Sequence, residues 1–131
     1  MLRRATPRDE RGTAAVEFAL VLPLLLVITL ALVQVGLLVR DRLLVESVAR
    51  AGARAAALQD DVGAVRDAAT AAAPSLDSTA LSLTVGRAGV RGDPVTVTVD
   101  YTSVVRVPLI DWLFGSGVPM QAASTDRQEF G

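Results

Sequence analysis

The sequence predicts an α+β fold in which one long N-terminal helix is followed by a short second helix and a small antiparallel sheet. Two observations carry this prediction. A stretch of 22 uncharged residues, Phe18–Val39, is followed directly by apolar residues at helical spacing. From residue 81 onward the pattern changes to an alternation of apolar and polar residues. The length of 131 residues allows one domain of ordinary size.

The composition excludes several classes of function. Hydrophobic residues make up 51% of the chain, which is too apolar for a disordered protein. Arginine supplies all 13 basic charges against 14 acidic ones, and there is no lysine, histidine or cysteine. Zinc and haem sites, Ser-His-Asp triads and Lys chemistry therefore lack their side chains. The net charge of −1 gives no electrostatic basis for binding nucleic acid. We predict no enzyme activity, no cofactor, no metal and no small-molecule substrate.

The apolar stretch Phe18–Val39 predicts a transmembrane helix. At 1.5 Å per residue it is about 33 Å long, enough to cross the hydrocarbon core of a lipid bilayer. It is longer than the apolar region of a cleaved secretory signal, so we expect a retained anchor, with signal-peptide removal and a buried core helix as alternatives. We assign residues 1–12 to a leader, 13–39 to the transmembrane segment, and 40–131 to an amphipathic helix plus a small extracytoplasmic domain.

The charges flanking the span do not decide its orientation. Four arginines lie on each side: Arg3, Arg4, Arg8 and Arg11 before it, and Arg40, Arg42, Arg50 and Arg54 after it. The positive-inside rule is therefore tied. The short leader and the acidic balance from residue 40 onward favour a single-pass protein of the cell membrane, with a cytoplasmic N-terminus and an extracytoplasmic C-terminal domain.

Beyond the span, an apolar stripe at spacings of four and three residues predicts that the helix continues. The stripe consists of Leu44, Val48, Ala51, Ala55 and Leu58. The simplest interpretation is one helix from about residue 14 to 58, kinked at Pro23 and mildly weakened at Gly52. The alanine-rich run 49–57 predicts close packing of this helix on the sheet, or alternatively a surface for a partner helix.

A second short helix is expected after Asp60 and Asp61, which supply an N-cap, and it should run to Ala73 because Pro74 prevents its continuation. The alternating residues 81–85 and 95–101 then predict a β-hairpin with one buried face.

The apolar residues 108–114 could form a helical turn that packs onto this sheet. Within them, Asp111 is expected to cap a turn rather than to act as a catalytic acid. A weaker alternation through Val118, Met120 and Ala122 could add a third strand.

The most informative string is RGTAAVEF, residues 11–18, in which Gly12 ends the basic leader and Glu17 follows five residues later. It resembles the processing site of prepilins, where a membrane peptidase cuts after glycine. Glycine suits such a cleft because an extended backbone without a side chain can approach closely. Structural alternatives remain open, with Gly12 as a helix start signal and Glu17 as a partner of the helix dipole.

More broadly, RGTAAVEFALVLPLLL followed by DRLLVESVARAGARAAA resembles the TadE-like family over about Arg11–Ala57. The resemblance implies a pilin-like α+β fold and a structural role as a minor pilin or pseudopilin in a tight-adherence, Flp-type IV pilus or a related secretion system. It implies a prepilin peptidase, other pilin-like subunits, the pilus assembly machinery and the lipid bilayer as partners. Gly12 and Thr13 would form the processing site, and Glu17 and Phe18 would serve assembly. The alternative is a single-pass anchor that presents a small binding domain.

Overall fold

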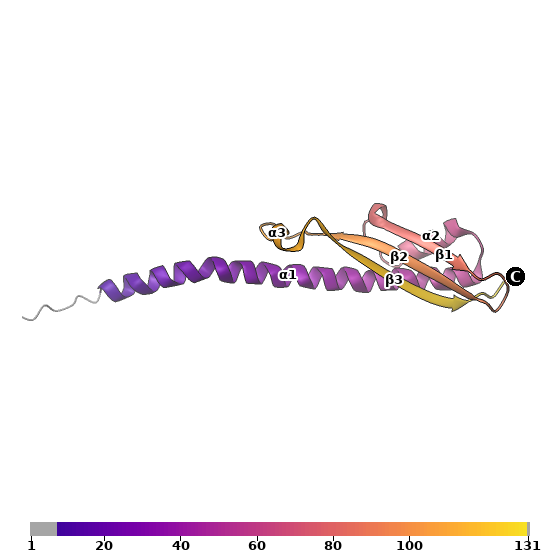
Figure 1. Ribbon diagram of the computed structural model, residues 1–131, viewed down its shortest axis with the longest axis horizontal. Helices are drawn as coiled ribbons and strands as arrows, with labels where there is room; N and C mark the ends of the chain where they lie inside the picture. The colour runs from indigo at the N-terminus through magenta and orange to yellow at the C-terminus, as the bar shows by residue number, and fades with distance from the viewer. Residues whose placement is uncertain (1–7, 131) are drawn as a thin grey trace, which may run out of the picture.

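The computed structural model describes the backbone of residues 8–130 and the side chains of residues 12–130. It has the expected α+β architecture, in which one long helix runs along a three-stranded antiparallel sheet (Figure 1). The elements in chain order are α1 (Arg8–Leu58), α2 (Val62–Ala71), the 3-10 turn η1 (Ser78–Ala80), β1 (Leu81–Arg87), β2 (Pro94–Val104), α3 (Asp111–Phe114) and β3 (Gly117–Arg127).

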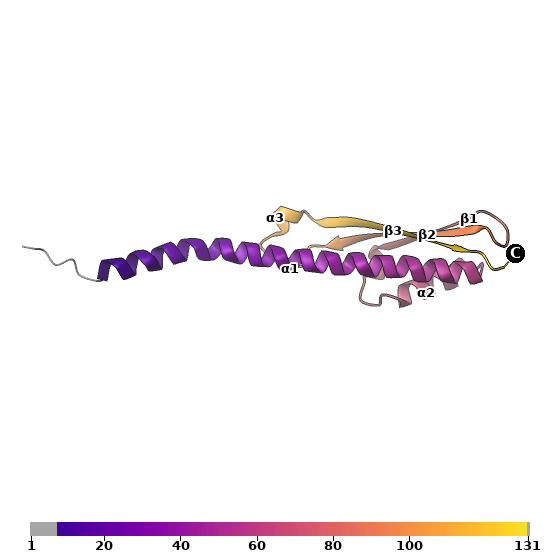
Figure 2. The ribbon, with the colours of Figure 1, turned by 90° about the horizontal axis from the view of Figure 1, so that it is seen from below.

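Helix α1 contains 51 residues and is therefore about 77 Å long. It starts at Arg8 rather than at residue 14, because the stretch from Arg8 to Thr13 holds no proline and its single glycine only weakens a helix. The helix continues through Pro23, and Figure 2 shows a gentle bend in its N-terminal half rather than a break. Residues 1–7 of the predicted leader lie outside the described residues.

Two segments of α1 differ in their surroundings. Every side chain from Gly12 to Leu26 is exposed, and we call this stretch the projecting segment. From Val27 to Leu58 one face of the helix lies against the rest of the chain, and we call this stretch the covered segment. We call the described part of the chain that follows α1 the sheet domain. Figures 1 and 2 show the projecting segment extending beyond the sheet domain, with nothing packed beside it.

The sheet has the order β1-β2-β3 with antiparallel neighbours. The predicted hairpin is confirmed, with Leu81 opposite Tyr101 and Val85 opposite Val97. The predicted third strand is also confirmed, with Met120 opposite Tyr101. Alternate residues of β2 point into the core, as expected for a strand with one buried face; they are Val95, Val97, Val99, Tyr101 and Ser103.

The core lies between this sheet face, α1 and α2. The alanine-rich run packs there as predicted, with Ala49, Ala53, Ala56 and Ala57 buried. The predicted stripe is rotated from the true buried face, however. Val48 is fully buried, but Leu58 is 56% exposed and the unpredicted Val45 is fully buried. The sheet and α2 cover different sides of α1, so the buried arc is wider than a single stripe.

Gly52 has a packing role that the sequence analysis missed. A Cβ atom at this position would lie 3.0 Å from Val97 Cγ1 and 3.3 Å from the Cβ of Ala69. These contacts are tighter than ordinary van der Waals distances, so glycine lets α1 approach both β2 and α2 closely. The cost in helix propensity is about 1 kcal/mol, and it is offset by this close approach.

Asp61 is the N-cap of α2, as predicted, and its carboxylate accepts a hydrogen bond from the backbone N–H of Gly63. Asp60 instead lies 3.3 Å from Arg87 in an ion pair. Arg87 also donates to the carbonyl of Gln59, at 2.8 Å, near the end of α1, where a cation is favoured by the helix dipole. Helix α2 ends at Ala71, two residues earlier than predicted, in a turn that precedes Pro74.

The prediction that residues 108–114 pack onto the sheet is wrong. The short helix α3 forms, but it lies beyond the end of the sheet, beside α1 (Figure 1). Trp112 is exposed. Only Val107 and Ile110 of this connection are buried. Asp111 accepts from the N–H of Trp112, which is consistent with a local turn role.

Candidate assembly helix and its junction with the sheet domain

Gly12 and Thr13 both lie within α1 and are exposed. A Cβ atom at Gly12 would meet nothing within 4 Å among the described residues, so their packing does not require a glycine there. The helix begins four residues before Gly12, which also argues against its being a helix start signal. Because a peptidase needs an extended backbone, cutting after Gly12 would require this part of α1 to unwind.

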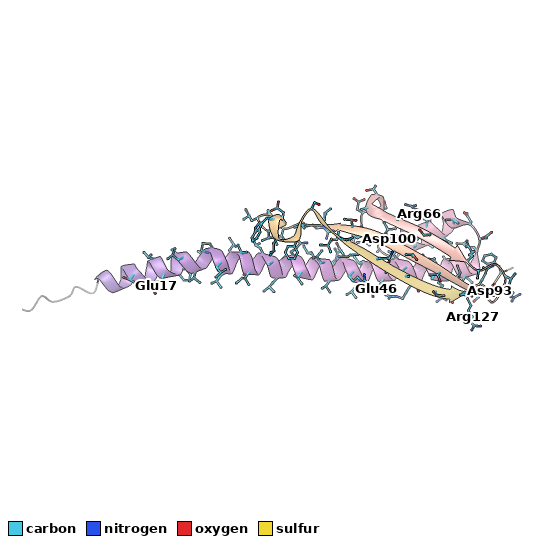
Figure 3. The ribbon with its side chains drawn as sticks, viewed as in Figure 1. Glu17, Glu46, Arg66, Asp93, Asp100 and Arg127 are labelled. Carbon is cyan, nitrogen blue, oxygen red and sulfur yellow. The ribbon has the colours of Figure 1, made fainter. Side chains whose placement is uncertain are left out.

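Glu17 and Phe18 lie in the projecting segment, and Phe18 is 64% exposed. Figure 3 places Glu17 on this segment, far from the sheet domain. Glu17 makes no hydrogen bond or ion pair with any other side chain that the structure describes. It follows Thr13 by four residues, about one helical turn. The sheet domain contacts none of the four predicted site residues.

The structure reveals two polar residues of α1 that the sequence analysis did not assign to a site. Gln34 and Asp41 are both fully buried, seven residues apart on the same face of the helix. The side-chain oxygen of Gln34 accepts hydrogen bonds from the backbone N–H groups of Arg106, at 3.1 Å, and Val107, at 3.2 Å. The only amide within the apolar stretch is therefore turned toward the protein.

Asp41 is held by the end of β2 and by the connection between β2 and α3. The Ser103 hydroxyl donates to its carboxylate at 2.6 Å, and Arg106 lies 3.1 Å away in an ion pair. Arg40 is a more distant partner at 3.7 Å. A buried carboxylate needs such partners because its loss of hydration is costly. We call the contacts of Gln34 and Asp41 with Ser103, Arg106 and Val107 the α1 clasp.

The α1 clasp fixes the position of the sheet domain along the helix. A shift of the sheet by one helical turn would leave the carboxylate of Asp41 buried without Arg106. A local sequence pattern could not have revealed this arrangement, since Asp41 and Ser103 are 62 residues apart. The available signal was the position of Gln34, a polar residue inside an otherwise apolar helix.

No group of three or more acidic residues within the described part of the chain could hold a metal ion. The carboxylates of Glu17, Asp41 and Asp111 lie at separate positions along the molecule, on the projecting segment, in the α1 clasp and in a local turn. The chemistry that this arrangement supports is therefore packing and charge pairing.

Comparison with protein families bears on the apolar helix. Residues 12–54 match the model of a family described as TadE-like protein. The resemblance to the TadE-like family is confirmed. The match covers 43 of the 131 residues and contains Gly12, Glu17, Gln34 and Asp41. Comparison with curated proteins and with solved structures gave no match.

The TadE-like segment coincides with α1, from the start of the projecting segment to near the end of the covered one. Its apolar part is long enough and apolar enough to cross a membrane. The family is a structural component of pili rather than a family of enzymes. Together, the match and the helix fit a membrane component associated with a tight-adherence pilus.

Proposed function

We propose that this protein is a minor, pilin-like subunit of a tight-adherence pilus or a related secretion system, anchored in the membrane by α1. Its N-terminus would face the cytoplasm and its sheet domain would lie outside. The observation that carries the proposal is the projecting segment, an apolar helix with every side chain exposed from Gly12 to Leu26. Such a surface needs lipid or neighbouring apolar helices around it.

In this proposal, a prepilin peptidase removes residues 1–12 and leaves Thr13 with a new α-amino group. Before cutting, the nitrogen of Thr13 is a peptide amide within α1, so no ammonium exists there. The new charge would appear one turn from Glu17. The amine of Thr13 in one subunit and the carboxylate of Glu17 in its neighbour could then pair as the helices come together.

Such a pair would set the stagger between neighbouring subunits. When assembly draws this end of the helix into the apolar core of a filament, an unpaired carboxylate there would cost about 2.5–3.5 kcal/mol, the value for the middle of a bilayer, so other staggers are disfavoured. Glu17 supports this role because it projects from a bare part of the helix and has no side-chain partner in the described chain. In the competing account, the Glu17 carboxylate pairs with the Thr13 amine of its own chain, and this pair does not set the stagger between subunits.

The decisive variant is Glu17→Gln, which keeps the shape and removes the charge. We expect normal removal of residues 1–12, measured by intact mass, and normal retention in membranes after alkaline extraction. Co-purification with other pilin-like subunits and piliation should be lost.

The matched control is Glu46→Gln on the covered segment. Glu46 forms exposed ion pairs with Arg42 and Arg50 on its own helix, and such pairs contribute little to stability. Piliation should therefore be retained in this variant. Normal piliation in Glu17→Gln would contradict the assembly role and would favour a single-pass anchor that presents a small binding domain.

A further inference from the structure

The connection between β2 and β3 ends in an apolar tip that the sheet does not cover. The exposed fractions are 68% for Leu109, 73% for Trp112 and 52% for Leu113. We call residues 108–115, which include these three side chains, the α3 tip. Leu109 also has a positive φ of 71°, an unfavourable conformation for a leucine, so the fold holds its outward direction at some cost in energy.

Along the helix axis, the α3 tip lies at the level of the apolar part of α1 and not beyond the end of that part. Both Figure 1 and Figure 2 show α3 next to the middle of the long helix. The bonds from Arg106 and Val107 fix the start of the connection at the level of Gln34. Gln34 lies five residues before Val39, and is therefore about 8 Å inside the end of the apolar stretch.

Partial burial along α1 shows how far the connection reaches. The helix residues with reduced exposure in this region share one face: Val27, Leu30, Ala31, Leu37 and Leu38. They lie on both sides of Gln34, at helical spacing. A membrane that enclosed the whole apolar stretch Phe18–Val39 would therefore have to accommodate the α3 tip as well.

The polar groups of the tip are suited to a place with little water. The indole N–H of Trp112 donates to the carbonyl of Leu109 at 2.9 Å. The backbone N–H groups of Leu113 and Gly115 donate to the carbonyls of Ile110 and Asp111. Irregular backbone at membrane depth requires such internal partners, because lipid offers none. The tip thus presents apolar surface outward while several of its donors are already satisfied.

We propose that the α3 tip inserts into the lipid interface on the side of the membrane that carries the sheet domain. This inference rests on the proposed function, in which α1 spans the membrane. It places the boundary of the hydrocarbon core near Gln34 rather than near Arg40. Tryptophan is the residue type typical of such an interface. Asp111, which is exposed at the tip, limits how deeply the tip inserts, because a carboxylate remains hydrated only near the headgroups.

The opposite boundary then falls near the other end of the projecting segment. Glu17 precedes Gln34 by 17 residues, about 26 Å along the helix axis. This distance is slightly less than the thickness of a hydrocarbon core, so Glu17 lies close to the opposite interface in the unassembled subunit. The protein would be held by two contacts with lipid, α1 itself and the α3 tip.

Trp112 is the only tryptophan of the chain, so its fluorescence reports on the tip alone. The full chain would be reconstituted in vesicles of phosphatidylcholine with some phosphatidylglycerol, containing lipids with a doxyl quencher near the headgroup or near the acyl-chain end. We expect the emission of Trp112 to lie at shorter wavelength than that of free tryptophan in water. Quenching by the doxyl group near the headgroup (the shallow label) should be several-fold stronger than quenching by the doxyl group near the acyl-chain end (the deep label). Quenching by aqueous iodide should be several-fold weaker than for free tryptophan.

The double variant Leu109→Ser and Leu113→Ser keeps the reporter and removes the apolar neighbours. We expect its quenching by the shallow label to fall and its quenching by iodide to rise. The matched control is Val90→Ser in the turn between β1 and β2, an exposed apolar residue at the other end of the sheet, and it should leave both values unchanged.

Two results would overturn the inference. Full access of iodide to Trp112, with no quenching by either lipid label, would show that the tip lies in water. Protection from iodide without lipid quenching would show that a second copy of the chain covers the tip. In both cases, retention of the protein in membranes after alkaline extraction would leave the proposed membrane anchor intact, whereas its release would contradict the anchor itself.

Discussion

In the projecting segment α1 presents leucine, valine and phenylalanine side chains outward, whereas in the covered segment its buried face consists mainly of alanine and valine, with Gly52. The apolar side chains of the two segments suit different surroundings. Large side chains provide broad surface toward lipid or toward neighbouring helices. Small side chains allow the backbone of α1 to approach the sheet and α2 closely. The size of the apolar residues thus distinguishes the exposed surface of the projecting segment from the buried face of the covered one.

The variant with the largest expected effect breaks the junction between α1 and the sheet domain. Arg106→Met leaves the buried carboxylate of Asp41 with only the hydroxyl of Ser103 and the more distant Arg40. We expect a loss of about 3 kcal/mol in the stability of the sheet domain, since breaking a buried ion pair from one side leaves an uncompensated charge.

Hydrogen exchange of β2 in the detergent-solubilised full chain would measure this loss. Leu24→Ala in the projecting segment is the control, and it should change the protection of β2 by less than about 0.5 kcal/mol, as for surface substitutions. Equal effects of the two variants would mean that the domain does not depend on the α1 clasp.

A second pair of variants tests the close approach in the covered segment. Gly52→Leu places a side chain where even a Cβ atom would lie 3.0 Å from Val97, so we expect a loss of about 2 kcal/mol from overpacking. Gly36→Leu adds the same side chain to the same helix at a position with nothing within 4 Å, and should be neutral or slightly stabilising. Thermal unfolding followed by near-ultraviolet circular dichroism would compare them. A similar melting temperature for both would contradict the packing role of Gly52.

The smallest expected effect concerns Asp77, the N-cap of the 3-10 turn η1. The side chain and backbone N–H of Thr79 donate to the Asp77 carboxylate and lower its pKa from the ordinary value of 3.8. A lowered pKa means that Asp77 stabilises the fold above that value, and that this contribution is lost as the pH falls through the folded-state pKa. Asp77→Ala should therefore lower the melting temperature slightly at neutral pH and not at acid pH. An equal decrease in the melting temperature at neutral and at acid pH would show that the effect comes from packing and not from the charge of Asp77.

Local patterns predicted the elements of this fold well, because each had a local physical cause. The alternation through Val95, Val97 and Val99 predicted a strand with one buried face, and Asp61 predicted the start of α2. The rotation of the buried face on α1 was not predictable in this way. An analysis of periodicity gives large apolar residues such as Leu58 the most influence. The actual contacts of α1 with the sheet and α2 are made by small residues such as Ala53.

The polar residues show a second limit of sequence analysis. Gln34 and Asp41 gain their meaning from a connection more than 60 residues later, and no spacing along α1 indicates that connection. Glu17 is the opposite case, since its position before an apolar stretch was conspicuous and the described part of the chain gives it no partner. Its proposed role lies in contacts between chains.

The way α1 is fastened to the sheet has a mechanical consequence. Its polar attachments lie toward both ends of the covered segment. Toward one end Asp41 contacts Ser103 and Arg106, and the adjacent Arg42 donates to the carbonyl of Gln121. At the other end the carbonyl of Ala57 accepts from the N–H of Glu129. The strands run alongside the helix (Figure 1). Tension applied through the projecting segment would therefore load these links together, in shear, and no single link would have to break first. A domain attached in this way resists a lengthwise pull better than one that can be peeled from its helix one contact at a time.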